Sequence, residues 1–273
     1  MIKTLTSILF GLVFACPASA HDFWLQPKTF RMDEPGPLVV QALVGHSDDL
    51  SVWHTAPSRI VAFSSVGPDG ITDQQAMLGA DPTEGTLRPV LPVAGLHVLV
   101  LTSTHSVSDL TADRFNSYVE EEGVLPILED RMARGAMDKN GREIYSRRAK
   151  SLVLVGDIDT ASEDRVTRPI GLTLEIVPLT NPMRALADDE FDFEVRYRGV
   201  PVAGALVHVQ SLDKDDVTIE PIRTDANGRA TFNPANGGTW MLHTVWSSPI
   251  FHDPRGDYDT VFSSLTFSFA PVD

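Results

Sequence analysis

A histidine follows directly on a leader-like segment at the start of the chain. Residues 8–15 form a short apolar run, and residues 18–20 (Ala-Ser-Ala) match the small-x-small pattern at which secretory signal peptides are cleaved. Cleavage after Ala20 would make His21 the first residue and would leave its α-amine free. A free amine has a pKa of about 8 and an imidazole of about 6.5, so a metal ion can compete for both nitrogens at neutral pH. An N-terminal His21 is therefore a candidate bidentate chelate.

Two further histidines are the candidates that complete such a site. His46 stands in the segment GHSDD at the end of a predicted strand, where ligands are often found. His243 lies near the middle of a later predicted strand. We expect His21, His46 and His243 to form a nitrogen-rich metal site that suits nickel, cobalt or copper. The only cysteine is Cys16, inside the leader, so no thiolate ligand is expected.

Other histidine and acidic side chains are assigned structural roles. His97 lies between apolar residues of a predicted strand and is expected in the core, whereas His208 is expected on the surface. The run Glu120-Glu121-Glu122 is expected to be a solvated helix end. No HExxH, HxH or other closely spaced metal motif occurs, so a metal site must be assembled from distant segments.

Composition and motifs argue against several functional classes. The net charge of −15 disfavours binding to nucleic acid or to an anionic membrane. No GxSxG, Walker A or GxGxxG pattern occurs, and we expect no catalytic residues. The apolar run of the leader is too short for a spanning helix, and no later segment reaches that length, so no direct membrane insertion is expected after cleavage. Lipid attachment at Cys16 is the alternative processing route, and it would leave His21 inside the chain.

The residues after the leader favour a mainly β fold that begins with a β-sandwich. Residues 37–45, 59–66 and 95–104 are short runs rich in β-branched residues and separated by turn residues. Within the last run, Leu96, Val98 and Val100 point to one side, and Leu99 and Leu101 to the other. This pattern is typical of a strand that is buried on both faces.

The remaining chain divides into a helical segment and a second sandwich. Residues 111 to about 150 favour a short helical insertion in an N-terminal β domain of residues 21–156. Residues 157–273 contain about seven short strands and no cysteine, which predicts an immunoglobulin-like or transthyretin-like sandwich. The expected organisation is therefore a signal peptide (1–20) and two β domains.

Several segments together carry a family resemblance. They are residues 21–27 (HDFWLQP), 114–124 (RFNSYVEEEGV), 142–156 (REIYSRRAKSLVLVG), 171–182 (GLTLEIVPLTNP), 201–207 (PVAGALV), 224–232 (TDANGRATF), 237–246 (GGTWMLHTVW) and 263–267 (SSLTF). In this order they resemble the NikM-like bacterial proteins, a periplasmic domain-of-unknown-function family linked to nickel and cobalt uptake. The resemblance implies an exported, metal-associated protein, and it supplies no assigned active site.

The sequence thus leads to one main hypothesis and two alternatives. The main hypothesis is a periplasmic protein that binds nickel, cobalt or copper through an N-terminal histidine and takes part in metal acquisition or handling, with a membrane transporter component as a partner. The first alternative is a non-catalytic two-sandwich module that binds a protein or a glycan without metal. The second is a copper oxidase with a histidine brace.

Overall fold

The computed structural model describes residues 22–45, 50–54, 56–78, 85–185, 189–213, 218–234 and 237–269. Three α-helices lie in these ranges, and strands dominate the rest. No helix in the described ranges is both long enough and apolar enough to cross a membrane. The prediction of a mainly β fold is confirmed.

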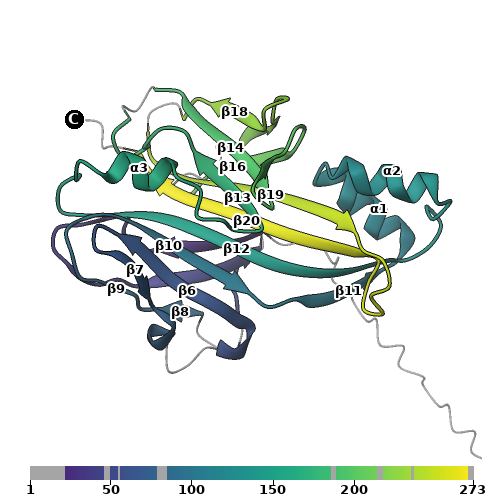
Figure 1. Ribbon diagram of the computed structural model, residues 1–273, viewed down its shortest axis with the longest axis horizontal. Helices are drawn as coiled ribbons and strands as arrows, with labels where there is room; N and C mark the ends of the chain where they lie inside the picture. The colour runs from purple at the N-terminus through teal and green to yellow at the C-terminus, as the bar shows by residue number, and fades with distance from the viewer. Residues whose placement is uncertain are drawn as a thin grey trace, which may run out of the picture.

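One large central sheet runs through the whole molecule (Figure 1). β12 (Gly141–Val155) lies in its middle, between β10 (Gly95–Ser103) on one side and β20 (Tyr258–Ser268) on the other. The full order is β17 (Thr218–Arg223), β16 (Leu206–Ser211), β19 (Thr239–Pro249), β20, β12, β10, β6 (Ile60–Gly67) and β7 (Gly70–Asp73), with β11 (Ser106–Leu110) and β2 (Arg31–Met32) also paired to β12.

Two smaller sheets cover opposite faces of the central sheet (Figure 1). The first contains β1 (Asp22–Pro27), β4 (Val40–Gly45), β5 (Ser51–Val52) and β8 (Thr86–Leu87). The second contains β13 (Leu174–Pro178), β14 (Phe191–Tyr197), β15 (Val200–Pro201) and β18 (Arg229–Phe232). The remaining short elements are the strand pair β3 (Gly36–Pro37) and β9 (Val90–Leu91), and the 3-10 turns η1 (Pro57–Arg59) and η2 (Gln75–Met77). This layering confirms the predicted sandwich packing.

Strand β10 is buried on both faces, as predicted. Leu96, Val98 and Val100 pack in the core that also contains Phe191 and Phe193 of β14. The alternate residues of β10, Leu99 and Leu101, pack in a separate core with Phe23 and Leu25 of β1. The alternation of strand side chains therefore divides β10 between two hydrophobic cores.

The helices α1 (Ala112–Glu121) and α2 (Leu125–Ala133) cover one end of the central sheet, while α3 (Ser162–Thr167) lies near the other end (Figure 1). Phe115 and Tyr118 of α1 pack with Phe262 of β20. A Cβ atom on Gly141 would lie 1.9 Å from the Phe115 ring, so this close approach requires glycine at the start of β12.

The helical segment is shorter than the predicted range of 111–150. α2 ends at Ala133 and β12 already begins at Gly141, because the chain from Gly141 onward pairs with β11 and, from Glu143, with β20. The boundary near residue 156 stays a prediction. Strand β12 lies before this boundary and β20 lies after it. The two strands pair in parallel from Glu143–Tyr258 to Ser151–Thr266.

A buried ion pair fixes the second small sheet to β12. Lys150 Nζ lies 2.9 Å from Glu175 Oε1, and both side chains are nearly inaccessible to solvent. Glu175 also accepts backbone N–H bonds from Ile170, Gly171 and Leu172 at 2.8–3.2 Å. Burial lowers the pKa of Lys150, and Lys150 and these amides hold the pKa of Glu175 below its usual value despite burial. The ion pair thus connects β12 to β13 and to the segment that precedes β13.

We predict that Glu175→Gln destabilises the protein by about 3–5 kcal/mol, because it leaves the Lys150 ammonium buried without its counter-charge. Urea denaturation at neutral pH measures this loss. Arg255→Ala is the control, since it breaks the exposed Arg255–Asp253 pair and should have a much smaller effect. A Glu175→Gln loss no larger than that of the control would contradict the assigned role.

Candidate functional site

His243 is the predicted site residue that the structure describes, and it lies against the start of β1. Its Nδ1 atom is 3.0 Å from Asp22 Oδ1, and the residue is 8% exposed. The contact arises because β1 packs across β20, the strand next to β19. Asp22 is the residue immediately after His21 in the chain.

A second histidine extends this contact. His208 of β16 is the register partner of His243, and the two imidazoles stack with a centroid distance of 4.6 Å and an interplanar angle of 9°. His208 Nε2 lies 3.6 Å from Glu122 Oε2 at the end of α1. We call Asp22, His243, His208 and Glu122 the histidine row.

Two members of the histidine row differ from the sequence expectation. Glu122 is 7% exposed and is not part of a solvated run, because it caps α1 where the helix meets the sheet. His208 is half-buried rather than a surface residue. The two histidines come together only because of the register in which β16 pairs with β19. No sequence motif predicts that register. His97, by contrast, is fully buried with its Nε2 2.8 Å from the Val93 carbonyl oxygen, which confirms its expected core position.

The Asp22–His243 contact has a defined chemical consequence. A carboxylate at Nδ1 favours the tautomer with its proton on Nδ1, so the lone pair resides on Nε2. Histidines that bind metals are commonly held by a carboxylate in this way. Within the described residues, however, no group of three or more His, Cys, Asp or Glu side chains is arranged to hold a metal ion.

The other two predicted ligands, His21 and His46, lie outside the described residues. Their described chain neighbours are Asp22 and Gly45, which face each other in the antiparallel pairing of β1 with β4. The predicted metal site therefore stays a prediction, with His243 as its described member.

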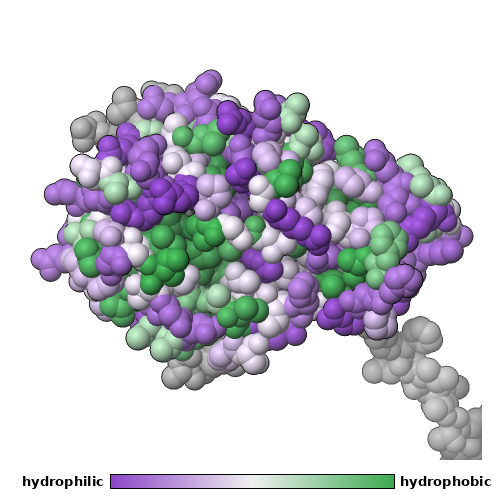
Figure 2. All heavy atoms as spheres, in the orientation of Figure 1, coloured by the Kyte–Doolittle hydropathy of each residue, from purple (hydrophilic) through white to green (hydrophobic). Residues whose placement is uncertain are grey.

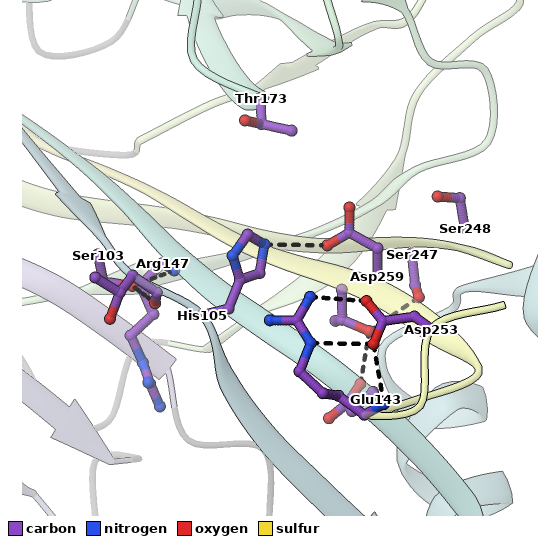
Figure 3. Close-up of polar contacts among 12 residues, drawn as sticks. Ser103, His105, Glu143, Arg147, Thr173, Ser247, Ser248, Asp253 and Asp259 are labelled. Atoms are coloured by element: carbon purple, nitrogen blue, oxygen red, sulfur yellow. Dashed lines mark hydrogen bonds and ion pairs between the residues drawn. The ribbon is translucent and has the colours of Figure 1, made fainter. Parts of the chain in front are cut away.

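A buried carboxyl group lies on the same face of the central sheet, toward α1. Thr260 donates a hydrogen bond of 2.6 Å to Glu143 Oε2, and the hydroxyls of Thr260 and Ser247 are 2.9 Å apart (Figure 3). Burial raises the pKa of Glu143 to about 7, although the Thr260 bond and the Arg147 charge act in the opposite direction. Glu143 can therefore exchange a proton near neutral pH.

Aromatic rings surround the guanidinium of Arg147, which lies four residues after Glu143 on β12. Its Cζ atom lies 5.0–5.8 Å from the ring centroids of Phe23, Trp53, Tyr145 and Phe262. Such cation–π contacts stabilise a charge that water does not reach fully. Phe23 and Trp53 belong to the layer of β1, so the arginine connects this layer to β12.

A separate polar cluster occupies the opposite face of β20. His105 Nε2 lies 3.5 Å from Asp259 Oδ1, and Arg198 lies 3.2 Å from Asp259 Oδ2. Figure 3 shows His105 and Asp259 facing each other, apart from Glu143. Since neighbouring residues of a strand point to opposite faces, Asp259 and Thr260 serve different clusters. His105 is therefore a suitable control for experiments on His243.

We predict that Glu143 makes stability fall as pH rises. Its folded pKa of about 7 exceeds the value of 4.5 for a solvent-exposed glutamate, so the folded state binds the extra proton between these pH values. The stabilising contribution is complete below pH ~4.5 and is lost as pH rises through ~7, a change of about 3 kcal/mol. Glu143→Gln should therefore gain about that much stability relative to wild type between pH 5 and pH 8, measured by urea denaturation at both values.

The control for this experiment is Glu129→Gln, which changes an exposed glutamate of α2 and should leave the pH dependence intact. Parallel pH profiles for wild type and Glu143→Gln would refute the assignment.

Comparisons with known proteins identify a family but no activity. Among curated proteins there is no match. The D0–D1 domain of intimin aligns with 89% of this chain and 96% of its own at 13% identity and a TM-score of 0.22. Trypsin-activated α2-macroglobulin from Escherichia coli aligns over 94% of this chain and 16% of its own at 11% identity and a TM-score of 0.22. The model of a domain of unknown function, DUF4198, matches residues 18–248, and the chain belongs to this family.

Proposed function

We propose that this protein is exported, is cleaved after Ala20, and binds a divalent transition metal ion through His21, His46 and His243. The observation that carries the proposal is the 3.0 Å contact between His243 Nδ1 and Asp22 Oδ1. It joins a predicted ligand to the residue that follows the predicted N-terminal chelate.

The Asp22 carboxylate supports a ligand role for His243. It orients the ring, favours the Nδ1–H tautomer and increases the basicity of Nε2, which are the effects that carboxylate partners have on metal-bound histidines. His243 is held further by the stacked ring of His208. Little conformational freedom would therefore be lost when His243 Nε2 binds a metal.

The pairing of β1 with β4 supports the participation of the other two histidines. Asp22 and Gly45 are partners in this pairing, and each is joined by one peptide bond to a predicted ligand, His21 or His46. The residue that follows His21 and the residue that precedes His46 therefore lie opposite each other at one end of the β1–β4 pair.

Buried aromatic residues anchor the start of β1. Phe23 and Trp24 are 2% and 3% exposed, and the Phe23 ring packs edge-on against Trp53 at 4.7 Å. A terminal segment that is fixed by buried aromatic residues does not fray as most chain ends do. An N-terminal chelate attached to Asp22 would therefore have a fixed point of attachment.

The proposed donor set favours particular metals and a particular cellular role. Two imidazoles, an N-terminal histidine and no thiolate suit nickel, copper or cobalt better than a soft Cu(I) or structural zinc site. On this proposal the protein acquires or handles such a metal in the periplasm and passes it to a membrane transporter component. The resemblance to the nickel and cobalt uptake proteins agrees with this role.

We predict that His243→Ala weakens the binding of Ni(II) or Cu(II) to the cleaved protein by at least about tenfold, because it removes an oriented ligand. Asp22→Asn, which keeps the ligand but removes the carboxylate charge, should weaken binding by about 10–100-fold. Isothermal titration with Ni(II), Co(II) and Cu(II) measures both changes, after intact mass has established that the chain begins at His21.

His105→Ala is the matched control, because His105 belongs to the cluster on the opposite face of β20. It should bind metal as wild type does. Circular dichroism checks that each variant is folded. If wild type and His243→Ala bind equally well, His243 is not a ligand. If the folded, cleaved wild type binds none of the three metals, the metal proposal fails and a metal-free interaction module takes its place.

A further inference from the structure

A pocket of about 470 Å³ lies at the other end of the central sheet from α1 and α2. Strands β6 and β7 form one wall, and α3 with the segment that follows it forms the other. Its volume falls in the range of small-molecule binding sites. It is formed by residues other than those of the histidine row, so it is independent of the proposed metal site.

Apolar side chains form most of this pocket. Val66 and Ile71 contribute from the two strands, and Ala161, Pro169 and Ile170 contribute from the α3 side. Ile71 is 78% exposed, the highest exposure of any large apolar residue in the described chain. Figure 2 shows a hydrophobic surface in this region, bordered by hydrophilic atoms over α3. A ligand that covered Ile71 would remove apolar surface from water.

Two arginines stand at the α3 side of the pocket. Arg165 is held by Asp159, with Nη1–Oδ2 at 3.0 Å, and it donates a bond of 2.9 Å to the Leu96 carbonyl oxygen. Arg165 Nη2 also donates a bond of 3.3 Å to Asp159 Oδ1, so these contacts fix the guanidinium in the wall of the pocket. Arg168 makes no ion pair or hydrogen bond with any described residue, and its side chain is exposed. The pocket therefore offers N–H donors that a bound acceptor can satisfy.

The charged residues of the pocket lining favour an anionic ligand. Two guanidinium groups and one carboxylate, Asp164, line the pocket, so its lining is net positive in a chain whose net charge is −15. Arginine binds carboxylates by paired, charge-assisted hydrogen bonds. An alkyl tail would cover Val66, Ile71 and Ile170 while the carboxylate meets Arg168.

We infer that this pocket binds a small amphipathic carboxylate, with its aliphatic part against β6 and β7 and its carboxylate at Arg168. A cationic amphiphile would meet the two arginines and is disfavoured. A neutral alcohol of equal length would fill the apolar part but could not form the ionic contact.

The test is calorimetric titration of the full chain with decanoate, decanol and decylammonium, each below its micelle-forming concentration. Decanoate should bind at least about tenfold more tightly than the other two, because a hydrogen bond to a charged group is worth about that factor or more. Arg168→Ala should remove this preference, and Ile71→Ser should weaken decanoate and decanol together. Arg114→Ala is the matched control, since Arg114 is an exposed arginine on α1, and it should change nothing.

Three results would overturn the inference. They are the absence of decanoate binding, equal binding of decylammonium, and decanoate binding that Arg168→Ala leaves unchanged. Circular dichroism establishes that Ile71→Ser and Arg168→Ala remain folded. Both positions are solvent-exposed, so we expect both variants to fold normally.

Discussion

The burial of β12 on both faces determines how the surrounding sheets pack. This strand pairs with β10 on one edge and with β20 on the other, and its side chains contribute to separate cores above and below the sheet. A strand in that position exposes little surface to solvent. Its buried charged groups, such as Glu143 and Lys150, must therefore find partners inside the protein.

The charged residues of β12 make specific contacts because most of them are withdrawn from solvent. Lys150 meets Glu175, Glu143 meets Thr260, and Arg147 lies among four aromatic rings. Each contact joins β12 to a different neighbouring element. The first small sheet, the second small sheet and the C-terminal strand are thus held to one strand by polar as well as apolar contacts. The histidine row lies at the edge of this arrangement, where β1, β16, β19 and α1 come together.

Much of the fold was predictable from the sequence because its cause is local. The two-sided pattern of Leu96 to Leu101 follows from the period of a strand, and it correctly predicted burial on both faces. The extent of the helical segment was less predictable. The residues from Arg142 to Lys150 are rich in charge and lack polar–apolar alternation, so their local pattern is a weak strand signal. Their pairing with β11 and β10 on one side and with β20 on the other makes them a strand.

The candidate site was only partly predictable for the same reason. His243 was identified from its place in the sequence, but Asp22, His208 and Glu122 come from segments far apart in the chain. Their proximity depends on strand register and on how α1 ends, which no motif encodes. The same holds for the pocket beside α3, whose lining residues come from two distant segments.

We propose that a free N-terminal His21 and His243 belong to one metal site. The most direct measurement compares Ni(II) affinity for the cleaved protein and for the same protein with one glycine added before His21. The added residue keeps every side chain but moves the free amine away from the His21 ring. We expect a loss of affinity of at least about tenfold, because one ligand is removed from the metal site. Equal affinities would contradict it.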